Sequence, residues 1–86
     1  MFYLLNSRFV RFVQMFTNIF VHLMQSRNVS SYKFTKDTGI DNGLISKWKN
    51  GIQLPSAVSL IKIADYFEVS VDYLLGRTDN PDSHKA

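Results

Sequence analysis

Residues 30 to 51, SSYKFTKDTGIDNGLISKWKNG, decide the fold of this chain. They predict two short helices joined by a tight turn. Ser30 is a favourable N-cap because its hydroxyl can accept from the free amides of the next turn. Gly39 stands where a chain leaving a helix often needs a positive φ, which glycine adopts without a Cβ clash. Asp41 then suits the positive start of the second helix, and Asn50-Gly51 would end it.

The apolar residues of this stretch are spaced to face one side. Phe34 and the small Thr35 would face the interior, and Ile40 would fill the corner of the turn. Ile45 and Trp48, three residues apart, would face inward from the second helix. The residues left outside are Asn42, Gly43, Ser46, Lys47 and Lys49. This is the layout of a helix-turn-helix, whose second helix enters a DNA groove.

Over about residues 16 to 76 the chain resembles the lambda-repressor-like, or Cro-type (XRE-family), DNA-binding domains. The resemblance is carried by VS at 29–30, FT at 34–35, GI at 39–40, IS at 45–46, Trp48, NG at 50–51, PS at 55–56 and LIKIADYFEVSVDYLLG at 60–76. It implies an all-α fold of five helices, here with an extended N-terminal helix. We expect an apolar extension at 1–14, the DNA-binding domain at 15–76 and a polar, frayed tail at 77–86.

Two further helices should follow the motif. Ser56 would cap the first, in which Leu60, Ile61, Ala64 and Phe67 recur at helical spacing and would pack under the motif. Ser70 would cap a last short helix over residues 71–75.

Composition limits the class of protein. Eighty-six residues mean one domain, which buries only about 60% of its surface. A hydrophobic fraction of 45% with seven Phe supplies the dense core that this requires. The absence of Cys excludes disulfides and Cys-based zinc sites.

The charged residues are unevenly distributed along the chain. Residues 1–53 hold seven Lys/Arg and two Asp, whereas residues 54–86 hold three Lys/Arg and five Asp/Glu. The basic half contains the motif, as contact with phosphates requires.

The N-terminus carries a heptad-like apolar seam, which runs through Phe2, Leu5, Phe9, Phe12, Phe16, Ile19 and Leu23. It predicts one long amphipathic helix, or two segments broken near Asn6-Ser7. Residues 1–14 could pack across their own domain or pair with a second chain. They could also be an upstream extension, with Met15 the natural first residue. An ordered segment would favour self-association, because exposed apolar patches mark interaction sites.

The second motif helix should read base edges. Its candidate base-contacting residues are Asn42, Gly43, Leu44, Ser46 and Lys47. The amide of Asn42 can pair with adenine N6 and N7, and the resembled family reads bases from this position. Gly43 would permit close approach of the backbone. Leu44 could press on a thymine methyl or belong to the domain surface. Lys47 could reach a guanine or a phosphate.

Phosphate contacts should surround that helix. The candidates are Ser31, Tyr32, Lys33, Lys36, Lys49, Asn50 and Gln53. The resembled domains usually place a Gln at the position of Ser31. Many of them also pair an Arg late in the first helix with a Glu late in the recognition helix, where this chain has Met24 and Lys49. The exchange removes both charges of the pair together and places a positive charge near DNA.

The leading hypothesis is a sequence-specific transcriptional regulator, a repressor of bacterial or phage origin, that binds a double-stranded operator as a homodimer on two half-sites. Dimer contacts would come from Val71, Leu74 and Leu75, with the Phe2, Leu5, Phe9 and Phe12 seam as a second source. Antitoxins and regulators of phage excision use related domains. The alternative is a protein-interaction module that reads its partner through the Phe-rich N-terminus.

Other classes find little support in the sequence. His22 and His84 stand apart from any catalytic set, and no metal-ligand or phosphate-loop motif is present. We therefore expect no enzymatic activity, cofactor or metal. No uncharged apolar run approaches the roughly 20 residues of a membrane span. No signal peptide is recognisable, so we expect a cytoplasmic, nucleoid-associated protein.

Overall fold

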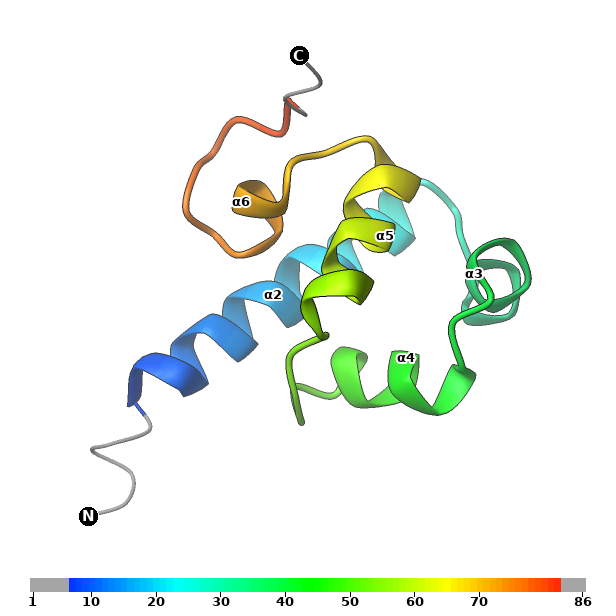
Figure 1. Ribbon diagram of the computed structural model, residues 1–86, viewed down its shortest axis with the longest axis horizontal. Coiled ribbons are helices and arrows are strands. Elements are labelled where there is room, and N and C mark those ends of the chain that lie inside the picture. Colours follow the sequence, from blue (N-terminus) through cyan, green and yellow to red (C-terminus); the bar gives the residue numbers. More distant parts are fainter. Residues whose placement is uncertain (1–6, 83–86) are drawn as a thin grey trace.

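The computed structural model describes residues 7–82, and all of its regular elements are helices (Figure 1). They are α2 (Ser7–Ser26), α3 (Ser31–Thr38), α4 (Asn42–Lys49), α5 (Ala57–Phe67) and α6 (Val71–Leu74). Five helices within these residues, the first of them long, confirm the predicted fold class.

The predicted caps form. The Ser30 hydroxyl accepts from the Lys33 amide at 3.0 Å, and the Asp41 carboxylate accepts from the Gly43 amide at 2.9 Å. Gly39 ends α3 with φ of +78°, as expected of a residue leaving a helix in the left-handed conformation. Ser56 and Ser70 cap α5 and α6 in the same way. These caps satisfy amides that helix starts leave without a partner.

Phe20 of α2 lies at the centre of an aromatic core. Its ring centroid is 5.4 Å from that of Phe16, 5.5 Å from Phe34, 5.9 Å from Trp48 and 6.4 Å from Phe67. Three of these four contacts are edge-to-face, an arrangement that the ring quadrupoles favour. The core therefore connects α2 with α3, α4 and α5.

The motif packs as predicted at its inner face. Phe34, Ile40, Ile45 and Trp48 are buried, and Thr35 is half-buried. The Thr17 hydroxyl of α2 also donates to the Trp48 carbonyl at 2.7 Å. Because these contacts hold the inner side of α4 against α2, the opposite side of α4 is presented outward.

The buried side of α5 differs from the predicted one at one residue. Ile61 is 54% exposed, whereas Ile63 is fully buried. The buried side of the helix runs through Ile63, Ala64 and Phe67, with Leu60 partly buried beside it. Ile61 lies about 100° around the helix from Leu60, which takes it off this stripe.

The prediction that Leu74 contributes to a dimer interface is wrong, because its side chain is fully buried in the core. Val71 and Leu75 are half-buried. The prediction of a frayed tail is also wrong as far as Asp82. The chain after α6 folds back so that the Ser70 amide donates to the Pro81 carbonyl at 3.1 Å (Figure 1).

The first part of α2 extends away from the other helices (Figure 1). From Val13 onward the helix buries a stripe that includes Phe16, Phe20 and Leu23, whereas Phe9 and Phe12 are exposed. The amphipathic helix is thus confirmed from Ser7 to Ser26. Phe2 and Leu5 of the predicted seam lie outside the described residues. None of the helices in residues 7–82 is both long and apolar enough to cross a membrane.

Candidate nucleic-acid interface

The outer side of α4 carries the predicted base-contacting residues. Asn42, Gly43, Ser46 and Lys47 are exposed. Leu44 is half-buried and packs against the core, so only part of its side chain faces outward. The helix therefore presents an amide, a hydroxyl and an ammonium along one exposed face, which are groups that hydrogen-bond to base edges in a major groove.

Gly43 has a role that the sequence reasoning missed. Its amide is held by the Asp41 carboxylate, and a Cβ added to Gly43 would lie 2.7 Å from Asp41 Oδ2. A larger residue would therefore require the Asp41 carboxylate, the end of a flexible side chain, to shift. Glycine leaves the start of α4 without a side chain at this position.

Asn50, predicted to contact phosphate, has its amide nitrogen engaged. Nδ2 donates to the Ser46 carbonyl at 2.8 Å and lies 3.4 Å from the Ser46 hydroxyl oxygen. To donate to a phosphate, Asn50 would have to use its second amide hydrogen or break the contact with Ser46. The hydroxyl hydrogen of Ser46 stays available to donate.

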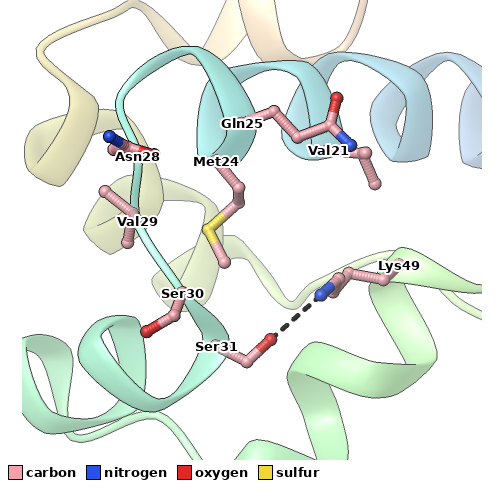
Figure 2. Close-up of a pocket in the computed structure, with 8 residues that line it drawn as sticks. All are labelled: Val21, Met24, Gln25, Asn28, Val29, Ser30, Ser31 and Lys49. Carbon is pink, nitrogen blue, oxygen red and sulfur yellow. Dashed lines mark hydrogen bonds between the residues drawn. The ribbon is translucent and has the colours of Figure 1, made fainter.

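Lys49 and Ser31 connect the two motif helices. Lys49 Nζ donates to Ser31 Oγ at 3.0 Å, which joins the last turn of α4 to the first turn of α3 (Figure 2). Both residues line a hollow of about 280 Å³, and the buried Met24 lines the same hollow. Met24 and Lys49 stand where resembled domains place an Arg–Glu pair. Here the two residues line the same hollow, and Lys49 binds Ser31 instead.

The other candidates on α3 differ in their electrostatic surroundings. Lys33 Nζ lies 3.0 Å from Asp37 Oδ2, and the same oxygen accepts from the Tyr66 hydroxyl at 2.6 Å. The hydrogen bond to Asp37, with partial burial, raises the pKa of Tyr66 to about 12. The bonds from Tyr66 and Lys33 lower the pKa of Asp37. Since its charge is compensated, Lys33 has less positive charge to offer phosphate than Lys36.

The remaining phosphate candidates are accessible to different degrees. Tyr32 is 76% exposed and Lys36 is exposed, whereas Gln53, in the loop after α4, is half-buried.

A polar strip of α2 adjoins Lys49 and was not singled out from the sequence. A second hollow, of about 490 Å³, shares Val21, Gln25 and Lys49 with the first. The other residues of its lining include Gln14 and Asn18. Neither lining contains a carboxylate, and residues 7–36 contain no Asp or Glu. This run without acidic residues is the sequence signal that could have indicated the strip.

Comparison with known proteins agrees with this geometry. The family model of the Cro/C1-type HTH DNA-binding domain matches residues 21–80. No curated protein and no solved structure gives a significant match. The matched segment contains α3, α4, α5 and α6 whole, together with the end of α2.

Proposed function

The chain belongs to the Cro/C1-type helix-turn-helix DNA-binding domains, and we propose that it is a transcriptional regulator, a repressor of bacterial or phage origin that binds a double-stranded operator. The observation that carries the proposal is the division of α4 into two sides. Ile45 and Trp48 are buried in the core, while Asn42 and Lys47 of the same helix are exposed. Such a helix can lie in a major groove with its exposed residues toward the base edges.

In this proposal the start of α4 reads the bases. Asn42 pairs with an adenine through its amide, and Lys47, one turn or more along, reaches a guanine or a nearby phosphate. Gly43 allows close approach of the main chain. Ser46 donates its hydroxyl, and the exposed part of Leu44 contacts a thymine methyl.

Phosphates bind around this helix. Lys49 and Ser31 form one contact point, because they lie at 3.0 Å from one another and come from both motif helices. Lys36 and the hydroxyl of Tyr32 add contacts along the outer side of α3. Lys33, Asn50 and Gln53 contribute more weakly, since the first two are engaged within the protein and the third is half-buried.

Repression would follow from occupation of an operator that overlaps a promoter. The protein would bind two half-sites about one helical turn apart as a homodimer, with Val71, Leu75 and the exposed start of α2 as sources of dimer contacts. It would act in the cytoplasm on the nucleoid. Residues 15–76 would form the DNA-binding domain, preceded by the extension at 1–14.

The test is selection of binding sites from random duplexes with the full chain, followed by titration of the selected duplex over a salt series. We expect a palindrome to be enriched and affinity to fall steeply with salt, because phosphate contacts release counterions. An Asn42→Ala, Lys47→Ala double variant, altered only at exposed positions, should lose the enrichment and keep its thermal melt.

A second candidate function is an antitoxin-like or protein-interaction module that uses the same fold. The exposed Phe9 and Phe12 favour it. Well-folded protein that enriches no duplex would support this candidate against the regulator.

A further inference from the structure

One side of α2 is polar along most of its length. Gln14, Asn18, His22 and Gln25 are exposed and recur at spacings of four, four and three residues, which places them on one side of the helix. At 1.5 Å per residue they span about 17 Å. The proposed phosphate contacts use none of them. We call this side the α2 strip and define it by these four residues.

The α2 strip adjoins the end of the recognition helix. All four of its residues line the second hollow, of about 490 Å³, together with Lys49, Asn50 and Gly51. Gln25 and Lys49 also line the first hollow, which contains Ser31 (Figure 2). The two hollows therefore adjoin one another at Lys49, one at the start of α3 and the other along α2.

The second hollow offers hydrogen-bond donors and no carboxylate. Its lining includes the amides of Gln14, Asn18 and Gln25, the imidazole of His22 and the ammonium of Lys49. Gln14 Nε2 lies 3.4 Å from Asn18 Oδ1, which engages that oxygen and leaves the N–H groups of Asn18 for an acceptor in the hollow. Such a lining suits an anion with several oxygens.

The segment after α4 supplies no charge of its own. Residues 50–61 contain no Lys, Arg, Asp or Glu. Lys49 is therefore the last cation before Lys62, which lies on α5 and lines neither hollow. Beyond Lys49, the α2 strip provides the donors that the end of α4 can offer to a DNA backbone.

We propose that the α2 strip binds a phosphodiester group of the operator, next along the strand to the phosphate held by Lys49 and Ser31. The inference deepens the proposed function and rests on it. Successive phosphates of one strand are about 3.4 Å apart along the axis of B-DNA, and Lys49, which lines both hollows, stands between the two sites. Because amides are neutral, their contact fixes the register of α4 in the groove and adds little to the dependence on salt.

The first test is binding of a selected duplex by an Asn18→Ala, Gln25→Ala double variant of the full chain over a salt series. We expect affinity for every duplex to fall about tenfold, since hydrogen bonds to a charged group are lost, with the slope of log K against log salt unchanged. Ser26→Ala is the matched control, because Ser26 is exposed on the same helix and lines neither hollow. Thermal melts check that each variant folds. Unchanged affinity in the folded double variant would overturn the proposal.

Asn18→Lys tests the same site by a gain. The added ammonium should raise affinity at low salt and steepen the slope of log K against log salt by about 0.9, the value for one further phosphate contact. Ser26→Lys makes the same change of charge outside the hollows and should leave the slope nearly unchanged. Equal steepening by both variants would reflect net charge alone and would reject the site.

Single methylphosphonate groups, each of which removes the charge of one phosphate, locate the contact in the duplex. One substituted position should weaken binding of the full chain and have no further effect on the Asn18→Ala, Gln25→Ala variant. The adjacent position on the same strand should show this coupling with Lys49→Gln. Additive losses at every position would contradict the proposal.

A free phosphate has the same chemistry as the backbone group and is tested separately. Titration of the full chain with inorganic phosphate, without DNA, should produce no saturable change in the side-chain amide signals of Asn18 and Gln25 in NMR spectra. Saturation at micromolar phosphate would assign the hollow to a free ligand and overturn its assignment to DNA.

Failure of this inference is distinguishable from failure of the proposed function. A chain whose binding to the selected duplex depends on Asn42 and Lys47, but not on the α2 strip, remains a regulator and rejects the strip as a phosphate site. A folded chain that binds no duplex rejects both.

Discussion

The Thr17 hydroxyl donates a 2.7 Å hydrogen bond to the main-chain carbonyl of Trp48, across 31 residues of sequence. The bond is buried and ties the middle of α2 to the last turn of α4. The bond therefore holds the C-terminal end of α4, and Asn42 lies at the N-terminal end of the same helix. Positioning of the recognition helix therefore depends on a side chain outside the helix-turn-helix.

Thr17→Val keeps the side-chain shape and deletes this hydrogen bond. We expect a loss of about 1 kcal/mol in the free energy of unfolding, since the Trp48 carbonyl still accepts from the amides of Asn50 and Gly51. Urea unfolding would measure it. Thr17→Ser, which retains the hydroxyl, is the control, and equal losses in both variants would assign the effect to packing.

Trp48→Ala should lower the free energy of unfolding by about 3–5 kcal/mol, because it leaves a cavity beside Phe16 and Phe20 in a domain with a small core. Trp48→Phe should cost clearly less. It keeps a ring in the cluster and removes an indole N–H that is buried without a hydrogen-bond partner within the described residues. A melting temperature unchanged by the alanine would refute this packing.

Tyr66→Phe should change the dependence of stability on pH. The pKa of Tyr66 is raised in the folded state to about 12 from 10, so its contribution is present below pH 10 and is lost as pH rises from 10 towards 12. The pKa of Asp37 is lowered, so its contribution is present above pH 3.8 and is lost as pH falls through the folded value. Thermal melts from pH 2 to 11 should show both slopes reduced in the variant and little difference in slope near neutrality.

Asn42→Ala should cost about 1–3 kcal/mol in discrimination at one base pair of the operator, since a bidentate amide contact is lost. Competition titrations with the four base pairs at each position would locate the effect. Affinity for unrelated duplexes should change little. An equal loss on all sequences would place Asn42 on the backbone of DNA and reject its role as a base reader.

Lys49→Gln should weaken binding to all duplexes alike and reduce the slope of log K against log salt by about 0.9, the value for one phosphate contact. Lys62→Gln is the control, because Lys62 is exposed on α5, outside both motif helices. An unchanged slope in the Lys49 variant would show that this lysine serves only to hold Ser31.

Much of the helix-turn-helix could be predicted from the sequence because its determinants are local. The caps at Ser30 and Asp41 and the left-handed turn at Gly39 depend on residues at most three or four positions away. The burial of Phe34, Ile45 and Trp48 follows from helical spacing within one element. The base-contacting set followed from the same spacing together with the family resemblance.

The predictions that were wrong involve neighbours distant in sequence. Ile61 and Ile63 are both apolar and two residues apart, and only the approach of α5 to the core decides which is buried. Leu74 sits in a four-residue helix, too short for periodicity to indicate an inner side. Asn80-Pro81 is a local turn signal, but the Ser70 amide that binds the Pro81 carbonyl precedes α6, so the sequence near Pro81 does not indicate this contact.

By itself, the sequence determined the helices, their ends and the side of α4 that faces outward, since these depend on backbone conformation and on side-chain periodicity within one element. Tertiary structure decided which charges are compensated and which surfaces are continuous. Lys49 meets Ser31, Asp37 meets Tyr66, and Met15 meets Gly76 only because packing of the aromatic core brings separate elements within a few ångströms. A hydrogen bond or a contact requires that proximity, and proximity between distant residues is a property of the packed chain.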